Sequence, residues 1–266
     1  MDKVIFKIGG SILDELPADF YQTIVFLKKS KQCDPVIVHG GGPAINKELS
    51  KSQVKSVFHD GLRVTTKEVL RIAEMVMSGS INKEIVKQVV QAGGVGFGLS
   101  GVDGSILKTV PYDPSGKLGF VGEVEEVEVG WLQLLIENGA IPVISPIGIG
   151  EDGQHYNVNG DVAAARVAAA LGGTLVFISD IPGVLETKDE NETLHSSLTN
   201  HEITTMIESG VIYGGMIPKV KSAIEALKAG VKETAIINGL NPTDITDFLS
   251  GKEVGTKITM GEVYHV

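Results

Sequence analysis

The segment Val36–Lys47, VIVHGGGPAINK, contains a short apolar run, three consecutive glycines and a polar segment with helical character. A β-branched run such as Val36–Val38 is typical of a strand that is buried on both faces of a parallel sheet. The glycines leave backbone N–H groups accessible to an anion, and a helix that begins near Pro43 adds the positive end of its dipole. We predict an anion-binding loop at the carboxyl edge of a parallel sheet; a tight turn that needs only small residues is the alternative.

Similar apolar runs recur along the chain, and the segments between them have the apolar spacing of helices. The chain starts with the order strand, glycine turn, helix, strand, glycine turn, helix. This order is typical of a parallel sheet with right-handed crossovers. We therefore predict an α/β protein, a three-layer αβα sandwich around a mostly parallel central sheet, with buried strands at 4–8, 36–38, 141–147, 175–179 and 235–238 and a hairpin within 105–121.

The candidate linker of the chain is the glycine pair Gly172-Gly173. It follows the alanine-rich segment Val162–Leu171, which is predicted to be a helix that ends at the first glycine. We expect two closely packed lobes, of residues 1–173 and 174–266.

The composition excludes several classes of partner. The net charge is -10 and no run of Lys or Arg is present, so nucleic acid and anionic membranes are poor partners. No apolar run approaches the length of a transmembrane helix, and the first residues lack the apolar core of a signal peptide. The single cysteine, Cys33, cannot form an internal disulfide. These features predict a cytoplasmic protein that acts on small molecules.

Two lysines lie beside glycine-rich turns. Lys7 is inside a predicted strand, where its charge is costly unless it meets a counter-charge or an anionic ligand; an edge lysine that reaches water is the alternative. Lys219 lies in the first turn of a helix that follows Gly214-Gly215, where a cation opposes the helix dipole unless an anion docks there; a plain surface lysine is the alternative. Such cations beside glycine turns indicate phosphate chemistry.

Two further polar residues are candidates for the same site. Asp161 begins a predicted helix after Asn157 and Asn159, and it is either a helix N-cap or part of a polar site. Arg63 lies between a glycine and a helix start, where its guanidinium can bind a carboxylate or simply reach solvent.

Known signatures of other enzymes are missing from the sequence. It has no Walker A motif, no protein-kinase signature and no Cys/His metal-ligand spacing. Gly96, Gly98 and Gly101 match the pattern GxGxxG, but they fall within a predicted strand and no helix opens after them. We discount a dinucleotide site and predict an anion-binding α/β enzyme, a phosphotransferase.

Six short motifs occur in a fixed order along nearly the whole chain: KIGGS at 7–11, HGGGP at 39–43, GLRVT at 61–65, NVNGD at 157–161, SD at 179–180 and GMIPKV at 215–220. The set resembles the amino acid kinase family, and within it the members that phosphorylate N-acetyl-L-glutamate. KxGGS is shared by the whole family, whereas the combination of HGGGP, GLRVT and NVNxD is more specific.

The resemblance implies that ATP phosphorylates the γ-carboxylate of N-acetyl-L-glutamate, the second step of arginine biosynthesis. Lys7 and Lys219 would neutralise the transferred phosphoryl group, and Asp161 would hold both lysines. The nucleophile is a carboxylate that is already ionised at neutral pH, so no general base is needed. Mg²⁺ would be carried on ATP, with few or no protein ligands.

The resemblance also implies binding residues. Gly41, Gly42, Arg63 and Asn157 would bind acetylglutamate in the N-terminal lobe, and Gly9 and Gly10 would bind phosphate oxygens. The nucleotide would lie on the C-terminal lobe, against Ser179, Asp180, Gly214, Gly215 and Met216.

One departure from the family pattern is Gly160, where alanine is usual; the change should spare the chemistry. Arginine-inhibited, hexameric members carry an extra helix before the first strand, and here six residues precede Lys7. We therefore expect a homodimer, joined through the helix after Arg63 and insensitive to arginine. The alternatives are a glutamate, aminoadipate-type or aspartate kinase and, outside the enzymes, a sensor of amino acids or nucleotides.

Overall fold

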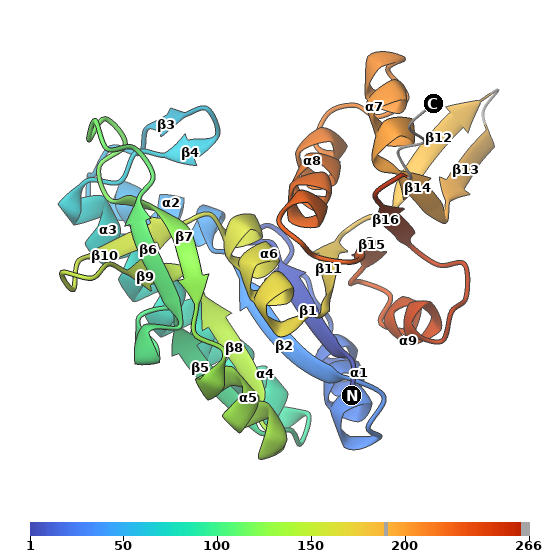
Figure 1. Ribbon diagram of the computed structural model, residues 1–266, viewed down its shortest axis with the longest axis horizontal. Coiled ribbons are helices and arrows are strands. Elements are labelled where there is room, and N and C mark those ends of the chain that lie inside the picture. The colour runs from blue at the N-terminus through green and yellow to red at the C-terminus, as the bar shows by residue number, and fades with distance from the viewer. Residues whose placement is uncertain (189–190, 262–266) are drawn as a thin grey trace.

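An eight-stranded sheet forms the centre of the protein in the computed structural model, which describes residues 1–188 and 191–261 (Figure 1). The strand order is β14-β16-β15-β11-β1-β2-β8-β5. Six strands from β15 to β5 run parallel, and β16 is antiparallel to β15. The bounds are β1 Lys3–Ile8, β2 Asp34–His39, β5 Gly96–Ser100, β8 Ile141–Ser145, β11 Thr174–Ser179, β14 Ser197–Thr199, β15 Thr234–Asn238 and β16 Thr256–Thr259.

The strands of this sheet carry apolar side chains on both faces, and helices cover both faces. Val4, Phe6 and Ile8 of β1 pack in one cluster with α1 (Ala18–Lys29), α4 (Asn82–Gln91) and α9 (Thr243–Leu249). Ile5 packs in the opposite cluster with α5 (Gly130–Glu137), α6 (Gly160–Leu171), α7 (Asn200–Glu208) and α8 (Met216–Lys228). The predicted three-layer αβα sandwich around a mostly parallel sheet is thus confirmed.

A small closed barrel stands at the β5 end of the molecule (Figure 1). It consists of β6 (Leu107–Pro111), β7 (Val121–Val127), β9 (Ile147–Ile149) and β10 (His155–Val158). The predicted hairpin supplies β6 and the first residue of β7. The prediction of a single strand at 141–147 is wrong. This segment is divided at Pro146 between β8 of the central sheet and β9 of the barrel, because proline has no N–H group to continue the hydrogen-bonded ladder.

The segment between β2 and β5 forms a helical layer beside the barrel. It contains α2 (Gly42–Lys51), the short strands β3 (Phe58–His59) and β4 (Leu62–Arg63), and α3 (Lys67–Glu74). A π-helical turn, η1 (Met75–Ile81), joins α3 to α4. The interval 58–65 therefore contains a two-stranded ribbon. The remaining elements are η2 (Asp103–Ser105), β12 (Val184–Lys188) and β13 (Asn191–His195).

The first two glycine turns touch each other at the carboxyl edge of the sheet. A Cβ atom on Gly10, after β1, would lie 2.9 Å from the backbone N of Gly42, after β2. Glycine at position 10 is therefore required by the close approach of two backbones. The sheet thus brings the turns after β1 and β2 to one place, as parallel strands do.

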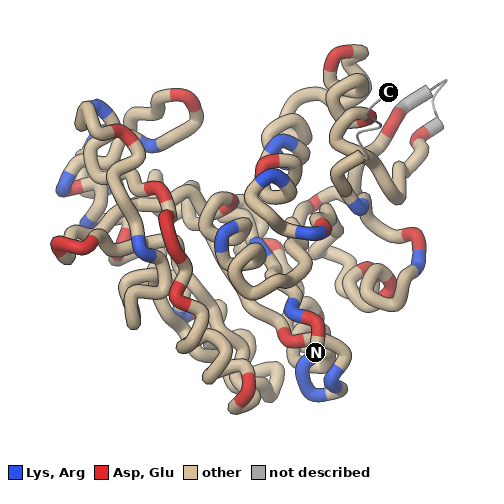
Figure 2. Tube along the Cα trace, in the orientation of Figure 1, with Lys and Arg blue, Asp and Glu red and all other residues tan. Residues whose placement is uncertain are grey.

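Charge is spread over the described surface in small groups, and Figure 2 shows no continuous basic stripe. None of the described helices combines the length and the apolar character that a membrane span requires.

Candidate active site

Two adjoining cavities lie at the carboxyl edge of the sheet, and Ser11 lines both. The first has a volume of about 380 Å³ and the second of about 550 Å³. Eight of the predicted site residues line the first cavity: Lys7, Gly9, Gly10, Gly41, Gly42, Arg63, Asn157 and Asp161. The second is lined by Asp180, Gly215, Met216 and Lys219.

Lys7 forms an ion pair with Asp161 at one end of the first cavity. Its Nζ lies 2.5 Å from Oδ1 of Asp161, and the side chains are 17% and 29% exposed. Lys7 shares the β1 face of Ile5, which is covered by α6, the helix that carries Asp161. The lysine inside the strand therefore has the counter-charge that its partial burial demands.

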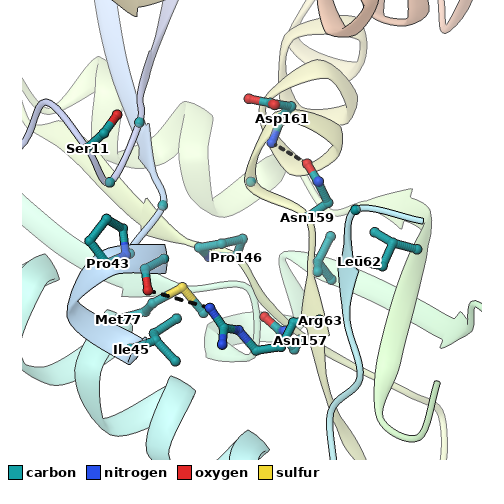
Figure 3. Close-up of a pocket in the computed structure, with 18 of the residues that line it drawn as sticks. Ser11, Pro43, Ile45, Leu62, Arg63, Met77, Pro146, Asn157, Asn159 and Asp161 are labelled. Carbon is teal, nitrogen blue, oxygen red and sulfur yellow. Dashed lines mark hydrogen bonds between the residues drawn. The ribbon is translucent and has the colours of Figure 1, made fainter. Parts of the chain in front are cut away.

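Asn159, and not Asp161, is the N-cap of α6. The Asn159 side chain accepts hydrogen bonds from the backbone N–H groups of Asp161 (2.8 Å) and Val162 (3.3 Å). The alternative that Asp161 is the cap is thus wrong, and its carboxylate is available to the cavity (Figure 3). The nearest atom to a Cβ on Gly160 would be 3.7 Å away, in Gly40, so the usual alanine would also fit here.

Arg63 and Asn157 lie across the first cavity from Ser11 and Asp161 (Figure 3). Arg63 Nη1 donates to Ser56, Nη2 donates to the Gly42 carbonyl at 3.5 Å, and the guanidinium lies 4.6 Å from the ring centre of Phe58. Burial lowers the pKa of Arg63 from its usual value. A cation that is largely withdrawn from water in a cavity is suited to an anionic ligand.

Asn157 is held by the same part of the structure. Its Nδ2 donates to Thr65 Oγ1 at 3.1 Å, and Thr65 Oγ1 donates to the Arg63 carbonyl at 2.8 Å. The chain of bonds links β10 of the barrel to β4, so Asn157 and Arg63 are positioned together.

Lys219 points to the second cavity. Its Nζ donates to Ser179 Oγ at 2.6 Å and to Asp180 Oδ1 at 3.0 Å. The Lys219 hydrogen bond lowers the pKa of Asp180. The predicted contact of Asp161 with both lysines is therefore seen for Lys7, while Lys219 contacts the end of β11.

Two helix N-termini at these cavities lack side-chain caps. The N-caps of α2 and α8 are Gly41 and Gly215, which have no side chain to accept from the first backbone N–H groups. The helix dipole favours an anion at both places, although at α8 the first two N–H groups already bond to carbonyls of the preceding turn. The cavities thus combine an ammonium group with an uncapped helix start.

Several residues of the cavities were missed by the sequence reasoning. Ser11 follows the predicted Gly9-Gly10 pair, and Asn159 lies within a quoted motif, so both could have been found from their neighbours. The apolar lining of the second cavity had no local signal because its members come from separate segments: Ile181, Leu185, Val211, Ile212 and Tyr213. No group of three or more metal-binding side chains is present in the described part of the chain.

A buried polar network supports the glycine turn after β2. His39 is fully buried; its Nε2 lies 3.2 Å from Asn82 Nδ2, and its Nδ1 lies 3.0 Å from the Gly40 carbonyl. Asn82 is the donor to Nε2, so the neutral ring carries its proton on Nδ1 and donates to Gly40. Burial is the main cause that lowers the pKa of His39 from 6.5 to about 4.

His39 should make the protein less stable at mildly acidic pH. Below pH 6.5 His39 becomes protonated in the unfolded chain, whereas in the folded chain it stays neutral until about pH 4. The free energy of unfolding therefore decreases as the pH drops through this window. The total loss is about 3 kcal/mol. Urea unfolding between pH 7.5 and 4.5 checks this: His39→Asn should remove most of the slope, whereas His201→Gln, at an exposed position, should keep it. Equal slopes for His39→Asn and wild type would contradict the assignment.

The fold and the two cation-lined cavities are those of an α/β phosphotransferase. The model of the amino acid kinase family matches residues 2–238, and the chain belongs to this family. It is 54% identical over 266 residues to a protein named acetylglutamate kinase from Oceanobacillus iheyensis, with 100% of both chains covered. It is 43% identical to a protein of the same name from Brevibacillus brevis, with 98% of both covered.

A solved structure shares this fold. The crystal structure of smu.665 from Streptococcus mutans UA159 superposes with a TM-score of 0.81 at 30% identity, over 98% of this chain and 99% of that one. The family resemblance and the fold predicted from the motifs are confirmed.

Proposed function

We propose that this protein transfers the γ-phosphoryl group of ATP to the γ-carboxylate of N-acetyl-L-glutamate, giving N-acetyl-L-glutamyl 5-phosphate and ADP in arginine biosynthesis. Relatives named acetylglutamate kinase, up to 54% identical over the full chain, support this function. The observation that carries it is the first cavity, which has the Lys7–Asp161 pair at one end and the Arg63 guanidinium at the other.

The proposed reaction is an in-line displacement. A carboxylate oxygen forms a bond to the γ-phosphorus, the bond to the β–γ bridging oxygen breaks, and ADP leaves with that electron pair. Lys7 and Lys219 neutralise the charge that gathers on the phosphoryl oxygens, and Asp161 holds Lys7 in place. N–H groups of the turns at Gly9-Gly10 and Gly41-Gly42 add hydrogen bonds.

Acetylglutamate would occupy the first cavity. Its α-carboxylate would pair with Arg63, and Asn157 would donate to a substrate oxygen. The γ-carboxylate would then point toward Lys7, across the cavity. The volume of about 380 Å³ suits a small dicarboxylate.

ATP would occupy the second cavity. The apolar side chains Ile181, Leu185 and Ile212 offer a surface for the base, and Lys219 with the uncapped start of α8 faces the phosphates. Ser179, Asp180, Gly214, Gly215 and Met216 would form the nucleotide side. This division supports an acetylglutamate-binding and dimerising lobe of residues 1–173 and an ATP-binding lobe of 174–266.

Mg²⁺ would enter as part of MgATP. Asp161 and Asp180 each face a lysine ammonium, and the described side chains offer no ready group of metal ligands. This donor set fits an ion carried mainly by phosphate oxygens. When bound, the ion neutralises phosphate charge.

A homodimer is the assembly that the surface favours. β5 is an edge strand of the central sheet, and three large apolar side chains near it and along the adjoining helix are exposed: Phe97 (46%), Val90 (55%) and Met75 (51%). An unpaired edge with exposed apolar side chains favours pairing with a second copy. Light scattering should give twice the chain mass of 28.1 kDa; a monomer would contradict the proposal.

We assign the protein to the cytoplasm, where this biosynthetic reaction would take place.

Arg63→Met should raise the KM for acetylglutamate about 10- to 100-fold, the size expected when a hydrogen-bonded ion pair with substrate is lost. kcat should change much less, because the α-carboxylate carries the same charge in the ground state and the transition state. Steady-state kinetics with saturating ATP measures this. Arg71→Met, at an exposed position of α3, is the matched control. An unchanged KM would show that Arg63 does not bind the substrate.

The function itself is tested by trapping the acyl phosphate as a hydroxamate, with ATP and N-acetyl-L-glutamate, L-glutamate or L-aspartate as acceptors. Signal with acetylglutamate alone is the expected result. Signal with a free amino acid would make the chain another kinase of the family, and no signal with any acceptor would favour a non-catalytic sensor.

A further inference from the structure

The carboxylate of Asp161 has a second partner on another helix. Ser222 Oγ donates to Asp161 Oδ2 at 3.1 Å, while Oδ1 of the same carboxylate faces Lys7. Ser222 belongs to α8, and Asp161 belongs to α6. The two oxygens thus join β1, α6 and α8 at one point beside the first cavity.

Ser222 follows Lys219 by three positions on α8, so the two side chains lie on the same side of the helix. A contact that holds Ser222 also determines where the first turn of α8, with Lys219, lies relative to Lys7. Lys219 itself contacts Ser179 and Asp180, so its own bonds do not link it to Asp161 in this structure.

Other charged side chains lie in the cavity on the α8 side of the carboxylate. A cavity of about 360 Å³ between α6 and α8 is lined by Asp161 and Ser222 and also by Arg166 and Lys221. Arg166 already pairs with Glu123 at 3.7 Å, but a carboxylate that is held at Oδ1 alone can still rotate and turn an oxygen into this cavity. The Ser222 hydrogen bond opposes that rotation.

We propose that Ser222 is a positioning residue for phosphoryl transfer: its hydroxyl orients the Asp161 carboxylate toward Lys7 and ties α8, with Lys219, to the first cavity. This inference rests on the proposed function, because it assigns Ser222 a role through the two lysines. Ser222 touches neither cavity that would hold a substrate. Its loss therefore acts on the rate of transfer and leaves substrate binding in place.

The test compares Ser222→Ala with Ser222→Thr in the hydroxamate assay. Ser222→Ala should lower kcat about tenfold, the size of one lost hydrogen bond to a charged group, with the KM values for ATP and acetylglutamate within twofold of wild type. Ser222→Thr keeps the hydroxyl and should restore most of kcat. Ser209→Ala, which removes an exposed serine whose Oγ bonds within its own helix turn, is the control and should behave as wild type.

A double-mutant cycle separates this role from a general structural one. Ser222→Ala should have no further effect on single-turnover rates in an Asp161→Asn background, because the carboxylate that it orients is gone. A kcat within twofold of wild type for Ser222→Ala, or an equal loss in both backgrounds, would overturn the inference. If wild type forms no acyl phosphate at all, the proposed function fails first and the inference fails with it; an active wild type with an unaffected Ser222→Ala rejects the inference alone.

Discussion

Replacing Lys7 with methionine is expected to lower kcat about 10²- to 10³-fold, as the loss of one preorganised donor to a transition-state oxyanion does. Methionine keeps an unbranched side chain of similar length, but it removes the ammonium group that pairs with Asp161 and would face the transferred phosphoryl group. The KM for acetylglutamate should change little because Arg63 and Asn157 are intact. Steady-state kinetics of acyl-phosphate formation gives both parameters.

The control for this variant is Lys3→Met. Lys3 lies on the same strand, at the opposite end from the cavities, and it does not line either of them. Both variants should give the circular dichroism spectrum of wild type. Near-normal turnover of a folded Lys7→Met protein would show that Lys7 has no part in the transfer.

Lys219→Met should have an effect of similar size on kcat, about 10²-fold or more, because a second charge beside the transferred group is removed. This variant should differ from Lys7→Met in its KM for ATP, which should rise. Its KM for acetylglutamate should stay near the wild-type value. Lys219 lines the second cavity and contacts Ser179 and Asp180 there. Kinetics with each substrate varied in turn separates the two effects.

Lys228→Met is the matched control, since Lys228 is an exposed lysine of the same helix that pairs with Glu225. Lys219→Arg should recover little activity, because a planar guanidinium does not reproduce the compact charge of an ammonium group. If Lys219→Met raised only the KM for acetylglutamate, the assignment of the second cavity to ATP would be wrong.

Local patterns were enough to predict the central parallel strands and the glycine turns that follow β1 and β2. β2 and the start of α2 follow from an apolar run, three glycines and Pro43, all of which act within a few residues. The two lysines were found because each is locally unfavourable, one inside a buried strand and one at a helix start. The functional signal in this sequence is thus the conflict between a charged residue and its local surroundings.

The partners of these residues had no local signature. Asp161 and Asn159 are equally good caps by sequence, and only the position of β1 beside α6 makes Asp161 the partner of Lys7. Likewise, the His39–Asn82 contact depends on the π-helical turn that ends just before Asn82. The role of Asp161 remained open because its partner lies on a distant segment, and the His39–Asn82 contact could not be predicted for the same reason.

The sequence by itself determined the buried strands at 4–8, 36–38, 175–179 and 235–238, the glycine turns, the candidate charged residues and the family resemblance. Each of these depends on the periodicity or the motif spacing of residues that are neighbours in the chain. Tertiary structure alone decided that β9 leaves the central sheet for a barrel, that the site residues divide between two cavities, and that Ser222 reaches Asp161. The physical reason is that these outcomes depend on the order in which strands pair and helices pack, and contacts between distant segments leave no periodic pattern in either segment.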